Sequence, residues 1–219
     1  ADSIIACDKS KERLISLEEK YGIRISESNR DVFLKSSIVI LAVKPQNMKE
    51  VLEEIKPDQK VCERKIIISI AAGIKTGFIE KILFSGIDEN QKNLFAVSRT
   101  MPNTPGLAGA GITGICFNSS MSEEDIQTVR NIFGSIGKII PCSEDAMDAV
   151  TAMTGSGPAY VLYFIESMME AGKKLGFTEE ESLFLAIETV NGSVKLMEAS
   201  SESPEILRKK VTSPGGTTE

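Results

Sequence analysis

The run of residues 213–218 combines residue types that suit the binding of a small anion. Its sequence is SPGGTT, so two adjacent glycines leave the backbone free to turn and two threonines follow where a helix is expected to begin. Successive backbone N–H groups at the start of a helix bind anions, and threonine hydroxyls add neutral donors and acceptors beside them. The run therefore predicts a carboxylate site, although on spacing alone an interhelical turn with a threonine cap is equally typical.

Four other runs stand directly after expected strands. Ligands of an open parallel sheet bind beyond the carboxyl ends of its strands, so these positions favour a shared ligand site. In residues 71–73, two alanines and a glycine would let a flat group approach the backbone. The prolines around Asn103 and Thr104 would hold an amide and a hydroxyl in a rigid turn. Each run by itself is more typical of a plain loop; the four are residues 7–9, 44–45, 71–73 and 100–105.

Asp8 and its neighbours bear on the choice between two nicotinamide cofactors. An acidic residue at the end of the second strand of a dinucleotide fold favours the ribose hydroxyls of NAD. The nearby Lys9, Lys11 and Arg13 favour the additional phosphate of NADP, and we expect NADP. No G-x-G-x-x-G follows an expected strand, so a dinucleotide fold would need its pyrophosphate turn upstream of Ala1.

The composition disfavours several other kinds of site. The chain has no histidine and its four cysteines form no CxxC pair, so we expect no metal site. A net charge of -6 disfavours a nucleic-acid partner. The longest apolar stretch, residues 66–73, is too short to span a membrane, and no signal peptide opens the chain. We therefore expect a cytoplasmic protein with reduced thiols at Cys7, Cys62, Cys116 and Cys142.

The elements that must position these residues alternate over the first two thirds of the chain. Alternation of strands and helices predicts a parallel sheet with helices on both faces. The Ile- and Val-rich run 37–43 is typical of a strand that is buried on both faces. Strands are expected at 3–6, 23–25, 37–43, 65–70, 94–99, 111–117 and 138–140, with helices at 9–20, 46–55, 76–84 and 122–133 and a short one opening at Ser28.

Only helices are expected after Pro141. They cover residues 143–150, 158–175, 178–197 and 204–210, and the glycine-bearing run 154–158 interrupts the pattern as a tight turn. We therefore expect an α/β domain in residues 1–141 and an all-helical domain in residues 142–219.

The helix expected from Pro158 to Gly172 is apolar nearly all round, which is typical of a helix that is buried nearly all round. A second copy of the chain would cover it most simply, and further C-terminal helices are the alternative. The chain starts at Ala1 and ends at Glu219, where a helix is expected to open, so we expect a fragment that is truncated at both ends.

Five motifs occur in order along the chain, at residues 42–45, 69–73, 99–105, 155–160 and 213–218. Any one of them is weak evidence, but together and with this spacing they closely resemble pyrroline-5-carboxylate reductase. The resemblance covers essentially the whole chain. It implies a Rossmann-like domain that binds NAD(P)H, a helical domain that dimerises, and a cyclic imino acid bound between them near the dimer interface. Homodimers, or assemblies of dimers, are implied as well.

The resemblance also implies roles for individual residues. Cys7, Asp8 and Lys9 would lie by the adenosine 2′ position, Asn29 near the ribose, and Asn103 and Thr104 beside the nicotinamide. The substrate carboxylate would bind the amides of residues 213–218, and Thr218 would hydrogen-bond the ring nitrogen as the catalytic residue. The implied cofactor-binding residues are Cys7, Asp8, Lys9, Asn29, Ala42, Val43, Lys44, Pro45, Ile70, Ala71, Ala72, Asn103, Thr104 and Glu144; the substrate-binding residues are Ser213, Gly215, Gly216, Thr217 and Thr218.

The implied reaction is hydride transfer to the C=N carbon of 1-pyrroline-5-carboxylate, which gives L-proline in the final step of its synthesis. NADPH is the expected reductant, with NADH possible. An imine can carry its own proton as an iminium, so a chain without histidine is consistent with this chemistry, and the protein's task is mostly positioning.

Two alternatives remain open at this point. A related imine or β-hydroxyacid dehydrogenase would use a lysine of the helical domain as its acid, and Lys173 and Lys174 stand on the long helix. A non-catalytic dinucleotide-binding or dimerisation module is the other. Because the glycine-rich turn and the helices after Glu219 are missing, we also expect these 219 residues alone to be inactive or impaired.

Overall fold

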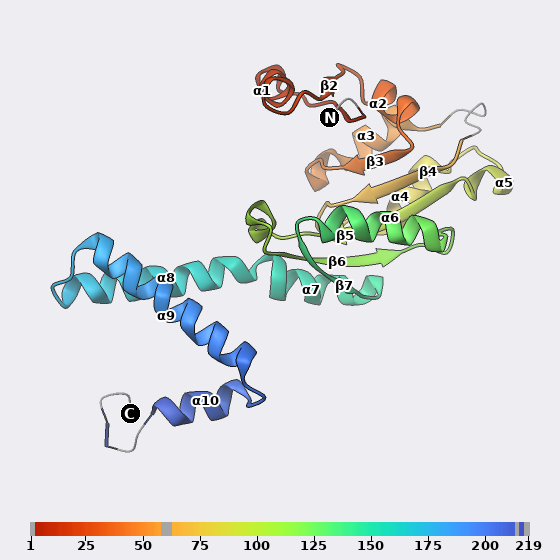
Figure 1. The fold of residues 1–219 in the computed structure, drawn as a ribbon. Helices are drawn as coiled ribbons and strands as arrows, with labels where there is room; N and C mark the ends of the chain where they lie inside the picture. The colour runs from red at the N-terminus through yellow and green to blue at the C-terminus, as the bar shows by residue number, and fades with distance from the viewer. Residues whose placement is uncertain (1–2, 58–62, 213–214, 217–219) are drawn as a thin grey trace. The chain divides into compact units, whose positions relative to one another are not determined.

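A computed structural model describes residues 3–57, 63–212 and 215–216 of the chain (Figure 1). The chain divides into two compact units, Ala1–Pro158 and Ala159–Glu219. Every strand of the described residues belongs to the first unit, and the second is helical. The order of elements is that of the expected Rossmann-like α/β domain followed by a helical domain.

A five-stranded sheet in the order β3-β4-β5-β6-β7 forms the centre of the first unit. All neighbouring strands are parallel except β5 and β6, so the expectation of a parallel sheet is wrong for that one pair. The link between them, residues 102–110, holds only a short 3-10 turn, and parallel neighbours need a longer crossover. The strands are β3 (Ile38–Leu41), β4 (Lys65–Ser69), β5 (Phe95–Met101), β6 (Gly111–Phe117) and β7 (Gly137–Pro141).

A separate two-stranded parallel sheet pairs β1 (Ile5–Ala6) with β2 (Arg24–Ile25). Among the described residues, no strand pairs with the outer edge of β3.

The helices of the first unit follow the apolar spacing of the sequence. On α3, Met48, Val51, Leu52 and Ile55 are all buried, because they share one face of the helix. These helices and turns are α1 (Lys11–Tyr21), α2 (Asn29–Lys35), η1 (Pro45–Asn47), α3 (Met48–Ile55), α4 (Thr76–Leu83), α5 (Glu89–Lys92), η2 (Thr104–Ala108), α6 (Glu123–Gly134), η3 (Glu144–Ala146) and α7 (Met147–Val150).

Helices cover both faces of the five-stranded sheet. The core beneath α2, α3 and α4 includes Leu41, Ile67 and Val97, whereas α6 covers Ile66 and Ile68 on the opposite face. The expectation that β3 is buried on both faces is wrong for one face, because Ile38 and Ile40 are 36% and 47% exposed. They continue the rows of Ile66 and Ile68, but α6 does not extend over β3.

The segment between β7 and the helical unit packs on the sheet. A Cβ at Gly114 would lie only 2.8 Å from the Val150 side chain, so α7 rests directly on β6. Residues 142–158 therefore belong to the first compact unit, beyond the domain boundary expected near Pro141. The tight turn expected at residues 154–158 is instead a π-helical turn, Thr151–Gly155, in which the Ser156 N–H donates to the Thr151 carbonyl at 3.0 Å.

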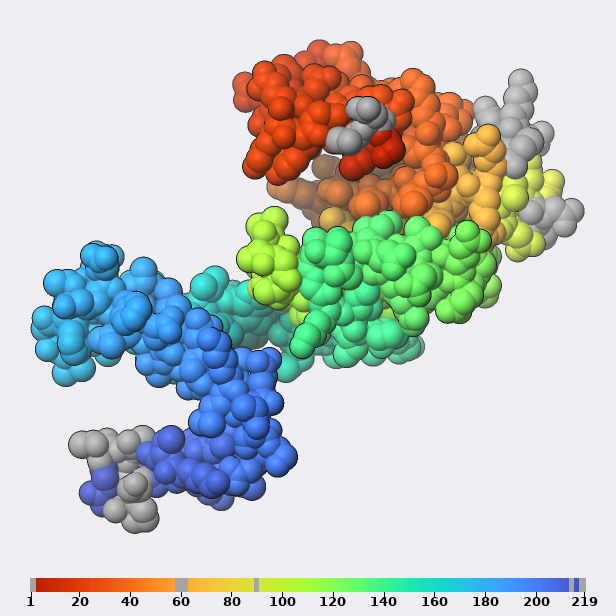
Figure 2. Space-filling model, in the orientation of Figure 1, coloured from red at the N-terminus to blue at the C-terminus, as the bar shows by residue number. Residues whose placement is uncertain are grey.

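The helical unit consists of α8 (Gly157–Lys174), α9 (Glu179–Ala199) and α10 (Pro204–Val211). Thr178 and Glu181 form the expected capping box at the start of α9, and Ser203 caps α10. No residue of α8 is buried, and Tyr163 is 71% exposed. The visible face of the α8–α9 pair, cyan to blue in Figure 2, is not covered by α10. No helix among the described residues is long and apolar enough to cross a membrane.

Candidate functional site

The turns that follow β3 and β4 lie side by side at the carboxyl edge of the sheet. Leu41 and Ser69 are paired at the strand ends, and the Ile70 N–H donates to the Leu41 carbonyl at 3.3 Å. The structure therefore brings residues 42–45 and 70–73 together, as the strand-end argument predicts.

Small side chains leave the backbone of the second turn open. Ala71 is buried and its N–H donates to the Ser69 hydroxyl at 3.3 Å, while Ala72 and Gly73 are exposed. Gly73 adopts a φ of 74°, which glycine tolerates without strain, and a Cβ there would meet nothing within 4 Å. A flat ligand group can approach this backbone closely.

The first turn presents a lysine to solvent. Ala42, Lys44 and Pro45 are exposed, whereas Val43 packs against the core beneath α3 and α4. Among the described residues, no carboxylate lies within ion-pair distance of the Lys44 ammonium. Lys44 is therefore available to a phosphate or a ribose.

The residues after β1 contact α3, the helix that follows the first turn. Lys9 pairs with Glu50 of α3, with Nζ 3.2 Å from Oε2. The Asp8 carboxylate accepts hydrogen bonds from the Ser10 N–H at 2.8 Å and from Arg13 Nη1 at 3.1 Å. The segment that follows β1 therefore offers one carboxylate and several cations within a few residues. This combination suits a hydroxylated or phosphorylated sugar.

Asn29 is held by a second acid of α3. Its backbone N–H and side-chain amide donate to the two oxygens of Glu54, at 3.0 and 2.7 Å. Burial raises the pKa of the neighbouring Cys7 thiol, and the negative charges of Glu54 and Asp8 raise it further. Cys7 thus remains a protonated thiol at neutral pH and does not act as a nucleophile.

Glu50 and Glu54 are contacts of the site that were not expected from the sequence. They stand four residues apart, so they share the outer face of α3, which follows residues 42–45 after the short turn η1. Two acidic residues four positions apart, close after a motif at the end of a strand, are a pattern from which these contacts could have been predicted.

Glu144, in η3, contacts the first residue of α4. The Thr76 N–H donates to Glu144 Oε1 at 2.7 Å and the Thr76 hydroxyl donates to Oε2 at 3.2 Å. Arg99, which is 2% exposed, has Nη1 4.0 Å from the Glu144 carboxylate and donates from Nη2 to Asp148 at 2.9 Å. Arg99 belongs to the motif at residues 99–105, but the sequence by itself predicts no role for it.

The neighbouring thiol of Cys116 is unreactive. Burial raises its pKa to about 11, and the charge of Glu144 raises it as well. A thiol with this pKa is almost entirely protonated at neutral pH, so Cys116 supplies no nucleophile to the site.

Asn103 uses its amide within the fold. Its Nδ2 donates to the Thr154 carbonyl at 3.0 Å, and its oxygen accepts from the Ile112 N–H at 2.9 Å. The side chain therefore anchors the 3-10 turn between β5 and β6 rather than pointing a free amide outward. Thr104, the next residue, is exposed.

Two residues of the expected anion loop lie in the described part of the chain. Gly215 and Gly216 are exposed, and Gly215 has a φ of 72°, which supports a backbone turn at this point. Ser213, Thr217 and the expected catalytic Thr218 lie outside the described residues.

Lys173 and Lys174, the lysines that the alternative hydroxyacid mechanism would use, lie in the last turn of α8. Lys173 pairs with Glu170 three residues earlier, and the hydrogen bond to that carboxylate, together with its charge, raises the pKa of Lys173. Both features disfavour Lys173 as a proton donor at neutral pH.

The edge of the first unit fits the two ends of a dinucleotide. The Asp8–Arg13 pair suits the ribose end, and the small residues of the turn at 71–73 leave room for a flat group. The G-x-G-x-x-G pattern that binds a pyrophosphate between a strand and a helix occurs once, at residues 109–114, but there it leads into β6 rather than into a helix.

Comparison with known proteins gives two matching families. Residues 144–219 match the family described as pyrroline-5-carboxylate reductase dimerisation, and residues 1–73 match NADP oxidoreductase, coenzyme F420-dependent. A pyrroline-5-carboxylate reductase of Aquifex aeolicus is 38% identical to the chain over 217 residues, which is 99% of this chain and 77% of that protein.

Solved structures of the same kind resemble the described fold. The pyrroline carboxylate reductase of Plasmodium falciparum with NADP bound is 34% identical, with a TM-score of 0.84 over 98% of this chain and 75% of that one. A pyrroline-5-carboxylate reductase of Coxiella burnetii is 35% identical, with a TM-score of 0.82 over 99% of this chain and 77% of that one.

Proposed function

The chain belongs to the pyrroline-5-carboxylate reductase family, and from this we propose that it reduces the C=N bond of 1-pyrroline-5-carboxylate to L-proline with NADPH. The observation that carries the proposal is the paired carboxyl ends of β3 and β4, where a turn of small residues leaves its backbone open to a flat ring. NADH is the second possible reductant. The cytoplasmic location expected from the sequence belongs to the same proposal, and fractionation of a cell extract tests it.

The proposed cofactor residues extend along the edge of the first unit. When bound, the reduced nicotinamide supplies a hydride to the imine carbon. Lys44 and the backbone of residues 70–72 contact the dinucleotide, Asp8 and Lys9 lie by the adenosine ribose, and Asn29 is held ready there by Glu54. Glu144 and Thr104 serve the nicotinamide end, where Asn103 acts by fixing the backbone of the turn.

The proposed substrate loop is residues 213–218. Backbone N–H groups around Gly215 and Gly216 bind the substrate carboxylate, and Thr218 orients the ring nitrogen. A substrate that arrives as an iminium already carries the proton that the product nitrogen keeps. The threonine then needs only to position the ring, and no strong acid is required.

A turnover assay with paired threonine variants tests this function. The full-length protein is supplied with 1-pyrroline-5-carboxylate and NADPH, loss of NADPH absorbance is followed, and L-proline is identified by mass. Thr218→Ala is expected to lower kcat/KM by roughly a hundredfold, because orientation of the ring is lost. Thr217→Ala, its neighbour, is expected to lose much less. Absence of proline formation by the wild-type protein would refute the proposed function.

We also propose that two copies of the chain associate through α8 and α9. The family model of the dimerisation region spans this unit, and the two helices leave large apolar side chains exposed. A groove of about 430 Å³ runs between them, lined by Tyr160, Val161, Phe164, Met168, Thr189, Val190, Ser193 and Val194. A homodimer, or an assembly of dimers, buries this surface.

A further inference from the structure

Arg99 occupies the middle of the sheet on the face that carries α4 and α7. It pairs with Ser69, the last residue of β4, on one side and with Cys116 of β6 on the other. At 2% exposed it is one of the largest fully buried side chains in the described residues. A charged group is rarely buried so completely unless a specific contact requires it.

The Arg99 guanidinium holds the segment that follows β7. Nη2 donates to Asp148 of α7 at 2.9 Å, and Nη1 lies 4.0 Å from Glu144 of η3. One buried cation thus attracts two carboxylates that are one turn apart, and this fixes the segment from Glu144 to Asp148 over the end of β5.

Glu144 connects the segment held by Arg99 to the turn after β4. Both of its carboxylate oxygens accept hydrogen bonds from Thr76, the first residue of α4, at 2.7 and 3.2 Å. A second bridge joins the same two segments, with Lys75 3.8 Å from Asp145. Since α4 begins three residues after Gly73, the position of Glu144 sets the position of the open turn at residues 71–73.

Stability alone does not account for Arg99. Its Nη1 is buried and donates no hydrogen bond among the described residues, which costs free energy. Removing one partner of a buried ion pair is costly mainly because it leaves the other charge buried, but the side chains of Glu144 and Asp148 are 28% and 75% exposed. An apolar side chain at position 99 would leave neither carboxylate fully buried, so the net contribution of Arg99 to stability is expected to be small.

We propose that Arg99 is a positioning residue for the reductase, which acts through Glu144 to hold the turn at residues 71–73 against the cofactor. The inference rests on the proposed function, because it takes that turn to be a dinucleotide contact. Arg99 itself need not touch the cofactor or the substrate.

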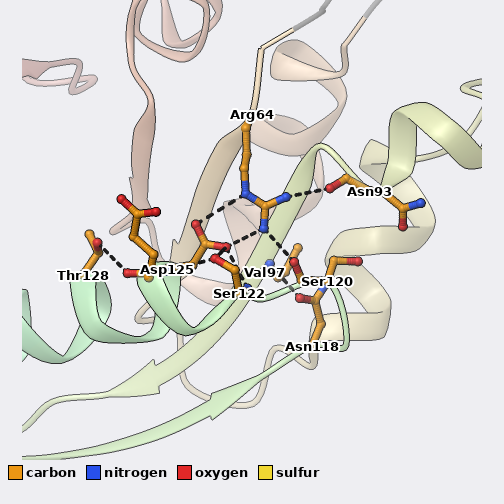
Figure 3. A network of polar contacts seen from close by, with 9 residues as sticks. Arg64, Asn93, Val97, Asn118, Ser120, Ser122, Asp125 and Thr128 are labelled. Carbon is orange, nitrogen blue, oxygen red and sulfur yellow. Dashed lines mark hydrogen bonds and ion pairs between the residues drawn. The ribbon is translucent and has the colours of Figure 1, made fainter.

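A second arginine–carboxylate pair provides a matched control at the other end of β4. Arg64 donates to the carbonyls of Asn93 and Ser120, at 2.8 and 2.7 Å, and pairs with Asp125, which Ser122 also contacts (Figure 3). This network ties α6 to the amino-terminal end of β4, far along the strand from residues 71–73. Its role is structural, so its loss should affect stability without affecting cofactor binding.

The experiment compares Arg99→Met with Arg64→Met in the full-length protein. NADPH affinity is measured by fluorescence titration and stability by thermal unfolding. We expect Arg99→Met to raise the Kd for NADPH roughly tenfold, with a Tm that stays within about 3 °C of the wild type or rises. Arg64→Met should lower the Tm by about 5 °C or more and leave the Kd unchanged.

Two further variants distinguish a positioning role from a structural one. Arg99→Lys keeps the charge without the fork that reaches both carboxylates, so its Kd should fall between wild type and Arg99→Met. Glu144→Gln should raise the Kd as well, and the double variant should be no worse than the more severe single change. An Arg99→Met protein that binds NADPH as the wild type does, or whose affinity falls only as its Tm falls, overturns the inference alone. A wild-type protein that binds no NADPH overturns the proposed function and the inference together.

Discussion

Asn29 and Glu54 form a two-point contact, in which the backbone N–H and the side-chain amide of Asn29 donate to the two carboxylate oxygens at 3.0 and 2.7 Å. The contact fixes the start of α2 to the last turn of α3. It therefore couples the proposed ribose residue to the helix that follows residues 42–45.

The first prediction concerns this contact. Glu54→Gln keeps the shape of the side chain but can accept only one of the two hydrogen bonds, and it removes the charge that strengthens both. We expect the KM for the nicotinamide cofactor to rise roughly threefold and the free energy of unfolding to fall by about 0.5–1 kcal/mol. Steady-state kinetics and urea unfolding measure the two effects. Glu53→Gln, on the same exposed face of α3, should change neither; a Glu54→Gln protein with wild-type KM would show that Asn29 needs no anchor.

The second prediction concerns the choice between NADPH and NADH. Arg13 lies 3.1 Å from Asp8, so the pair can exchange partners when a 2′-phosphate arrives beside it. Arg13→Met should raise the KM for NADPH roughly five- to tenfold and leave the KM for NADH unchanged. Lys11 also favours NADP by its position in the sequence, but it pairs with Glu27 at 2.7 Å and not with Asp8, the carboxylate at the proposed ribose position. Lys11→Met is therefore the control and should leave both KM values unchanged. Equal losses for the two cofactors would place the 2′-phosphate away from Arg13.

The third prediction concerns acid stability. Burial alone would raise the pKa of Asp125, but hydrogen bonds from Arg64 and Ser122 outweigh burial and lower the pKa to about 2 from its ordinary 3.8. A lowered pKa means that the native state binds this proton less readily than the unfolded chain does. The stabilisation is therefore complete above pH 4 and is lost as the pH falls from about 4 to about 2, by about 2 kcal/mol in all.

Urea unfolding at neutral pH and at about pH 3 measures this loss. Asp125→Asn should be less stable than the wild type at neutral pH and should lose less stability on acidification. If both proteins lose the same stability, the acid sensitivity arises from other carboxylates.

Local patterns in the sequence were sufficient for the strands and for most helices, although the short helix α5 was not expected. The burial of Met48, Val51, Leu52 and Ile55 follows from helical spacing, and the start of α9 follows from the pairing of Thr178 with Glu181. The strand-end turns at residues 42–45 and 70–73 were also predictable, because neighbouring parallel strands end at one edge.

Contacts between distant segments were not predictable in this way. Arg99 and Glu144 are 45 positions apart, and nothing local in either segment indicates that the other is near. The antiparallel pairing of β5 with β6 and the exposure of Ile40 depend on the path of a link and on the reach of α6. The amide of Asn103 has the chemistry of a binding group, but its nitrogen donates to the Thr154 carbonyl and its oxygen accepts from the Ile112 N–H.

The last prediction concerns the groove between α8 and α9. Phe164 lines it and is 57% exposed, so in a dimer through this surface the ring would be buried by the partner copy. Phe164→Glu would place a charge in that apolar contact, which costs several kcal/mol unless the charge is paired. We expect the dimer dissociation constant to rise by at least about a hundredfold, as measured by sedimentation velocity across a range of protein concentrations. Asn191→Asp adds the same charge to α9 at an exposed position outside the groove lining, and it should leave the dissociation constant unchanged. A Phe164→Glu protein that sediments as the wild type does at every concentration would show that the copies associate through another surface.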